Sequence, residues 1–168
     1  KENNYISKIG VSIYTEDEIN SMLDSVLKPE VIQPPLNILD TRLFKHGILT
    51  RLVNQGIEIH VRSVFLQGLF YLSEPDLNNH FSDAIPCIDK LKSIAAEASL
   101  TLPELSLLWL VNLEEVSKVI IGVDNTNQLK MHLETLKKKV EPAIFEKALS
   151  ICYENETILN PSLWPSIS

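Results

Sequence analysis

The sequence has few of the residues that mark metal, disulfide or phosphate-loop proteins. Its two cysteines, Cys87 and Cys152, lie far apart, with no CxxC motif and no histidine cluster near either. This pattern gives little support to a metal site or a disulfide framework. Only five glycines occur, and none forms the phosphate loop of nucleotide hydrolases. We therefore expect two reduced thiols, no metal ligands and a cytoplasmic protein.

Positive charge and long apolar runs are also scarce. The chain has 15 Lys and Arg against 22 Asp and Glu, a net charge of −7, which argues against a nucleic-acid or anionic-membrane surface. No apolar run approaches the ~20 residues that span a bilayer, and no signal peptide opens the sequence. With 168 residues, 45% of them hydrophobic, the chain is long enough for one soluble domain with a real core.

The chain does contain a repeated pattern in which a short apolar segment ends in polar residues and a helix follows. Strands are predicted over residues 7–12, 31–33, 57–63 and 118–122. Helices are predicted over residues 15–28, 41–54, 83–98, 102–111, 126–139 and 142–153. Strands separated by helices indicate a parallel α/β sheet with right-handed crossovers. Because α/β barrels keep their chemistry at the carboxyl ends of the strands, these polar ends predict one face of a binding site.

Local signals refine this outline. Thr15 with Glu18 and Thr101 with Glu104 are predicted capping boxes. Residues 64–82 lack clear periodicity and are predicted to be a long functional loop. In the helix over 126–139, Leu129, Leu133 and Leu136 are expected to face inward, and His60 is interpreted as a core histidine rather than a catalytic base.

Five segments, in this order, resemble the aldo/keto reductase family. They are IGVSIY (9–14), VIQPPLNILD (31–40), IEIHVRSVFLQG (57–68), the helical pair ending in LSLLWLV (105–111), and VIIGVDNTNQL (119–129). The resemblance implies parallel (β/α) units that form the C-terminal half of a (β/α)8 TIM barrel. Residues 1–153 would be this half-barrel, and residues 154–168 a non-helical tail.

The same resemblance implies which parts of an enzyme the chain lacks. The catalytic Asp, Tyr, Lys and His of the family belong to the other half of the barrel, so no catalytic residue is assigned here. A whole barrel takes ~250 residues, and the chain begins with Lys1. We therefore expect a fragment of a longer enzyme. A half-barrel has two open sheet edges, which predicts either the missing N-terminal half or self-association as its partner.

The resemblance further implies a site for NAD(P)H. At its nicotinamide end, Ser12 and Gln33 would bind the carboxamide and Arg62 would stack on the ring, although Ile13 replaces the usual Asn. Plainer alternatives are a capping amide for Gln33 and a salt-bridged rim arginine for Arg62. Around the pyrophosphate the family match places Ser63 and the turn residues Phe65, Gln67 and Gly68.

At the adenosine end the resemblance implies Gly122, Val123 and Gln128. The family often has Lys or Arg here for the 2′-phosphate of NADPH, and this chain has Asp124 close by. NADPH, NADH and no binding all stay open, and Asp124-Asn125 also fits a plain helix N-cap. The implied function is an NAD(P)(H)-dependent oxidoreductase acting on a small carbonyl or alcohol, with the isolated chain inactive. The alternative is a non-catalytic pseudo-reductase or a binding or assembly module.

Overall fold

The computed structural model describes residues 5–26 and 28–164. Four parallel strands form one sheet in the order β1-β2-β3-β4. They are β1 (Gly10–Ser12), β2 (Val31–Gln33), β3 (Glu58–Val61) and β4 (Lys118–Val119). All four predicted strands are present, and the parallel sheet is confirmed. β1, β3 and β4 are shorter than predicted.

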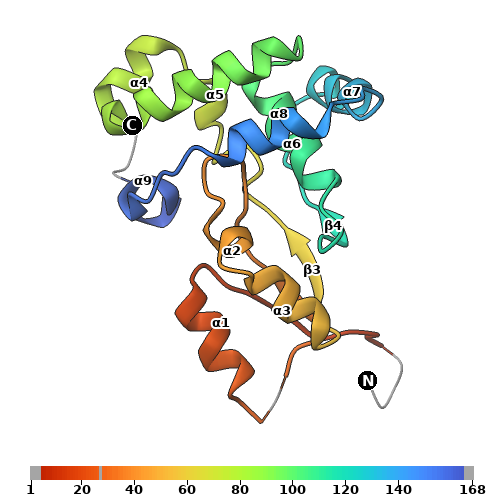
Figure 1. Cartoon of the computed structure of the whole chain (residues 1–168). Coiled ribbons are helices and arrows are strands. Elements are labelled where there is room, and N and C mark those ends of the chain that lie inside the picture. The colour runs from red at the N-terminus through yellow and green to blue at the C-terminus, as the bar shows by residue number, and fades with distance from the viewer. Residues whose placement is uncertain (1–4, 27, 165–168) are drawn as a thin grey trace.

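Helices connect and flank the strands. The α-helices are α1 (Glu16–Leu23), α2 (Arg42–Lys45), α3 (Ile48–Asn54), α4 (Glu74–His80), α5 (Ile85–Glu97), α6 (Leu102–Val111), α7 (Thr126–Thr135), α8 (Pro142–Leu149) and α9 (Glu156–Leu159). Three 3₁₀ turns are η1 (Leu69–Tyr71), η2 (Ser82–Ala84) and η3 (Pro161–Leu163). Figure 1 shows α4 and α5 at one end of the molecule and α1 at the other, with β3 between them.

Both predicted capping boxes are present. The Thr15 hydroxyl accepts from the Glu18 N–H at 3.2 Å, and the Glu18 carboxylate accepts from the Thr15 N–H at 3.0 Å. These bonds and a third from the Tyr14 N–H lower the pKa of Glu18. Thr101 and Glu104 make the same exchange at the start of α6. Each box satisfies N–H groups that have no partner inside the helix.

Several predicted elements differ from the structure. The helices predicted to end at residues 28, 139 and 153 end at Leu23, Thr135 and Leu149. The helix predicted over 41–54 is two helices, because Gly47 adopts a left-handed φ of 70° between them. The loop predicted over 64–82 contains η1 and α4. The tail predicted to be non-helical contains α9 and η3, whose first N–H groups donate to the side chains of Asn155 and Asn160. Residues 1–4 and 165–168, at the ends of the predicted half-barrel and tail, lie outside the described residues.

The core lies between the sheet and the helices on its outer face. Ile59 and Val61 of β3 are both fully buried on that face. α6 is almost entirely buried, as its apolar sequence predicted, and Trp109 packs edge-to-face on Phe44 with ring centroids 5.6 Å apart. α6 also touches α5, α7, β4 and η1. It therefore fixes the positions of the two segments that follow β3 and β4.

The prediction that Leu129, Leu133 and Leu136 face inward is wrong. Their exposed fractions are 42%, 52% and 47%. α7 packs on α6, but β4 is the last strand of the described sheet, so no neighbour covers the far side of α7. This apolar surface remains open.

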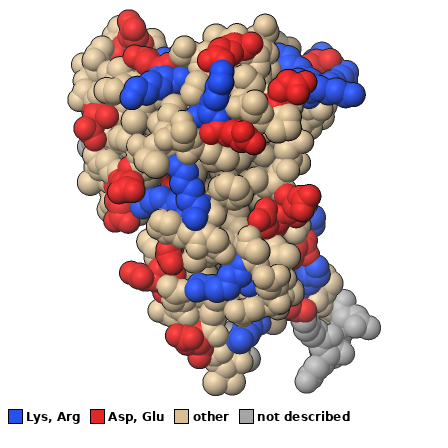
Figure 2. Space-filling model, in the orientation of Figure 1, with Lys and Arg blue, Asp and Glu red and all other residues tan. Residues whose placement is uncertain are grey.

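Charged residues of both signs are interspersed over the face shown in Figure 2. Among the described residues no single helix is long and apolar enough to cross a membrane. Ser82–Glu97 and Leu102–Val111 meet the length and composition requirement only as a pair, bent by 76°.

Candidate functional site

A cavity of about 440 Å³ opens where β3 and β4 end. Its walls come from the segment after β3, the segment after β4 and α7. The lining residues are Arg62, Ser63, Val64, Phe65, Gln67, Gly68, Tyr71, Ile120, Ile121, Gly122, Asp124, Gln128 and His132. Seven of the ten residues predicted from the sequence therefore lie around one cavity. Ser12, Gln33 and Val123 are not part of its lining.

The turn after β3 has an unusual backbone. Ser63, Leu66 and Gln67 have left-handed φ angles of 61°, 46° and 51°, and Gly68 follows at 86°. Such conformations are costly for residues other than glycine and tend to occur at functional sites. Bonds from the Leu66 N–H to the Ser63 carbonyl (2.9 Å) and from the Gly68 N–H to the Phe65 carbonyl (3.0 Å) close the turn.

Two buried polar side chains hold this turn in place. Ser106, fully buried in α6, donates to the Val64 carbonyl at 2.8 Å and accepts from the Ile38 N–H at 3.2 Å. Asn37, also buried, donates to the Ser63 carbonyl at 3.2 Å. Neither residue was predicted from the sequence. Ser106 lies in an apolar helix, and a hydroxyl in such a helix is easily taken for part of the core. The only sequence signal was a single hydroxyl inside LSLLWLV.

Arg62 connects the strand ends. Its Nε donates to the Ser12 hydroxyl at 3.2 Å, its Nη1 lies 3.5 Å from the Ser63 hydroxyl, and its guanidinium lies 4.2 Å from the centre of the Tyr14 ring. Ser12 in turn donates to the Gln33 carbonyl at 3.4 Å. The three predicted residues at the nicotinamide end are therefore linked, although the Gln33 bond uses its backbone.

One atom of Arg62 has no partner. Its Nη2 is buried and makes no hydrogen bond within the described part of the chain. A buried charged donor left unpaired is costly, and Arg62 carries this cost in the wall of the cavity. The salt-bridged alternative for Arg62 finds no carboxylate within its described contacts.

The opposite wall is the start of α7. The Asn125 side chain accepts from the N–H groups of Asn127 and Gln128, both at 3.0 Å, which confirms the N-cap interpretation for Asn125. Further along, the ring of His132 stacks on Phe65, with centroids 4.8 Å apart and planes 16° from parallel. Burial lowers the pKa of His132, so its neutral imidazole is favoured. Phe65 therefore joins the left-handed turn to α7.

The sheet face turned away from the core carries a separate ion cluster. His60 lies 2.6 Å from Glu58 through its Nε2, and Lys8 is bonded to the same carboxylate. The bonds from His60 and Lys8 lower the pKa of Glu58 to about 2. His60 is thus half-buried and hydrogen-bonded to Glu58 on the open face of the sheet, so the prediction of a core histidine is wrong. Among the described residues no group of three or more His, Cys, Asp or Glu could hold a metal ion.

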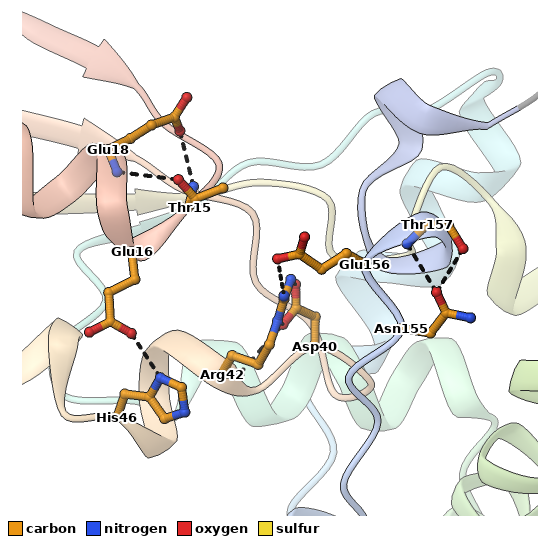
Figure 3. A network of polar contacts seen from close by, with 9 residues as sticks. All are labelled: Thr15, Glu16, Glu18, Asp40, Arg42, His46, Asn155, Glu156 and Thr157. Atoms are coloured by element: carbon orange, nitrogen blue, oxygen red, sulfur yellow. Dashed lines mark hydrogen bonds and ion pairs between the residues drawn. The ribbon is translucent and has the colours of Figure 1, made fainter.

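A second hollow, of about 330 Å³, lies between α1, α2 and α9. Arg42 is one of the residues that line it. In the polar network of Figure 3, Arg42 makes two bonds to Asp40 (2.8 and 3.0 Å) and one to Glu156 (3.1 Å). The bond to Asp40 is the main cause of the raised pKa of Arg42. On the other side of the hollow, His46 lies 2.8 Å from Glu16. The contact between Arg42 and Glu156 attaches α9 to the segment after β2.

The comparison with protein families decides the identity of this fold. The sequence model described as the aldo/keto reductase family matches residues 5–149. The chain belongs to the aldo/keto reductase family. Among curated protein sequences, none matches significantly.

Solved structures of aldo-keto reductases share this fold. One is a thermostable aldo-keto reductase, Tm1743, in complex with the inhibitor epalrestat, at 20% identity and a TM-score of 0.62 over 84% of this chain and 47% of that one. Another is the holo form of aldo-keto reductase AKR11C1 from Bacillus halodurans, at 18% identity and a TM-score of 0.66 over 87% and 51%. The chain spans about half the length of these structures. The predicted fold class, half of a parallel (β/α)8 barrel, is confirmed.

Proposed function

We propose that this chain provides the cofactor-binding half of an NAD(P)(H)-dependent oxidoreductase that transfers hydride between the cofactor and a small carbonyl or alcohol. The observation that carries the proposal is the Arg62 guanidinium in the wall of a cavity bordered by a left-handed turn. A cationic donor beside the Ser63 hydroxyl suits an anionic ligand. The pyrophosphate of a dinucleotide fits this chemistry.

Different residues at and beside the cavity would bind different parts of the dinucleotide. Ser63 and the turn residues Phe65, Gln67 and Gly68 would hold the pyrophosphate and the nearer ribose. Arg62 would stack on the nicotinamide ring with its charge beside the pyrophosphate. Ser12 and Gln33, linked to Arg62 through the Ser12 hydroxyl, would orient the nicotinamide amide, which needs both a donor and an acceptor. Gly122, Val123 and Gln128 would border the adenosine.

The bound dinucleotide would carry the hydride, and the protein would supply orientation and charge. We assign no catalytic residue to this chain, because the proton-transfer groups of the family belong to the other half of the barrel. The isolated polypeptide is therefore expected to bind the dinucleotide without turning over a carbonyl substrate.

The open apolar surface of α7 and the edges of β1 and β4 favour a partner that covers them. We propose that residues 1–153 form one half-barrel with residues 154–168 as its tail, and that either the N-terminal half-barrel or a second copy covers this surface. The same surface favours the alternative function, a non-catalytic assembly module. In that case the chain would associate with its partner but bind no dinucleotide.

The test is a calorimetric titration of the chain with NADH and NADPH. Arg62→Met should weaken binding of whichever dinucleotide binds by at least about tenfold, since it removes a charged donor worth about 1.5–3 kcal/mol. Arg51→Met, which removes an exposed cation of α3 bonded to Asn20, is the matched control. Equal affinities for the wild type and Arg62→Met would contradict the proposal.

A further inference from the structure

Among the described residues that line the cavity, Asp124 is the single carboxylate, and it is held in place. Asp124 lies directly before the α7 cap, and Gln128 lies one turn further on. The Asp124 N–H donates to Gln128 Oε1 at 2.7 Å, and Gln128 Nε2 donates to Asp124 Oδ2 at 3.2 Å. This reciprocal exchange fixes the carboxylate at the cavity edge while leaving the residue exposed.

The two ends of the cavity carry opposite charges. Arg62, after β3, is the one cationic side chain of the lining, and Asp124, after β4, is the one carboxylate. His132, the other titratable group on the α7 wall, is favoured in its neutral form because burial lowers its pKa. The lining near α7 thus holds a fixed negative charge, and no lysine or arginine of the lining offsets it there.

We propose that Asp124, held by Gln128, makes this cavity select NADH over NADPH. The inference rests on the proposed function, with the adenosine ribose beside α7. A carboxylate accepts hydrogen bonds from the hydroxyls of an unmodified ribose, which is how many dinucleotide sites recognise NAD. The same carboxylate repels a 2′-phosphate, which carries close to two negative charges at neutral pH.

The size of the preference follows from this repulsion. A carboxylate and a phosphate several ångströms apart in a solvent-exposed site repel each other enough to change affinity by about tenfold. Because both charges are exposed, added salt should screen the repulsion and narrow the preference. A preference caused by shape alone would not respond to salt in this way.

The test compares NADH and NADPH, which differ by the 2′-phosphate only, by titration of the chain in low salt. The wild type should bind NADH at least about tenfold more tightly. Asp124→Asn keeps the side-chain shape and should tighten NADPH binding by about tenfold while leaving NADH within a few-fold. Gln128→Ala frees the carboxylate to turn away and should reduce the preference in part. Asp89→Asn, which removes an exposed carboxylate on α5, should leave the preference unchanged.

The outcomes separate this inference from the function on which it rests. Binding of NADPH as tight as that of NADH, or an unchanged preference in Asp124→Asn, overturns the role of Asp124 and leaves the dinucleotide site intact. Binding of neither dinucleotide overturns the proposed function, and the preference falls with it. Circular dichroism of each variant confirms that it is folded.

Discussion

The hydroxyl of Ser106 donates to the carbonyl of Val64 at 2.8 Å, inside an otherwise apolar core. This bond ties α6, the most buried helix, to the left-handed turn that borders the cavity. The same hydroxyl accepts from the Ile38 N–H, so it also tethers the segment after β2. One small side chain thus positions two of the loops that follow the strands.

Ser106→Ala should therefore destabilise the protein, because it leaves a buried carbonyl and a buried N–H without their partner. The expected loss is about 1–3 kcal/mol in the free energy of unfolding, measured by urea denaturation. Ser93→Ala, at an exposed position of α5, should change stability by less than about 0.5 kcal/mol. Similar stabilities for the two variants would show that Ser106 is not required to hold the turn.

Gly68 and Gly122 form a matched pair for testing backbone strain at the cavity. An added Cβ meets nothing within 4 Å at either position, but Gly68 has a φ of 86° and Gly122 has no left-handed φ. Gly68→Ala should cost about 1–2 kcal/mol in the free energy of unfolding, whereas Gly122→Ala should be close to neutral. Equal effects in thermal or urea unfolding would contradict this account of the turn.

Arg42 links the tail to the body of the protein. Arg42→Met removes the cationic partner of Asp40, a residue that is only 5% exposed. The substitution should lower the free energy of unfolding by about 1.5–3 kcal/mol. Glu156→Gln removes the more exposed of the two pairs shown in Figure 3 and should cost less than about 1 kcal/mol. Limited proteolysis after residue 153 should be faster in Arg42→Met than in Glu156→Gln. The reverse order would show that Arg42 does not hold the tail on the protein.

His132 gives the stability of the fold a pH dependence of known sign. Burial lowers its pKa in the folded protein below the usual value of 6.5, so near that pH the unfolded chain binds more protons than the folded one. Stability should then fall as the pH drops through about 6.5 and level off below the folded pKa. His132→Phe, which keeps a ring against Phe65, should show a flatter profile between pH 7 and pH 5. Parallel profiles for the two proteins would mean that His132 does not contribute.

The order of the elements could be predicted from the sequence because it depends on local signals. Alternating apolar strand positions such as Ile59 and Val61, and the capping boxes of Thr15 and Thr101, indicate strands and helix starts directly. The predictions failed where one residue or one local hydrogen bond outweighs the apolar periodicity. Gly47 breaks a helix that is continuous by periodicity, and Asn155 and Asn160 start helical turns in a tail without an apolar pattern.

The site could be predicted in part for the same reason. Seven of the ten predicted residues line the cavity because they follow the ends of adjacent strands, β3 and β4. Ser12 and Gln33 belong to β1 and β2 and reach the cavity only through Arg62. The support from Ser106 and Asn37 depends on tertiary contacts between segments far apart in the sequence, which no local pattern records.

The apolar side of α7 supplies a last prediction, on association. Leu133 and Leu136 are 52% and 47% exposed, so Leu133→Gln with Leu136→Gln should change the stability of the folded chain by less than about 1 kcal/mol. If this surface pairs with a second copy, the wild type should dimerise at micromolar concentrations and the double variant should stay monomeric in sedimentation velocity runs. Lys130→Gln, on the same helix, is the control and should dimerise like the wild type. A wild-type chain that stays monomeric would rule out self-pairing, and the separately expressed N-terminal half-barrel should then bind the wild type but not the double variant.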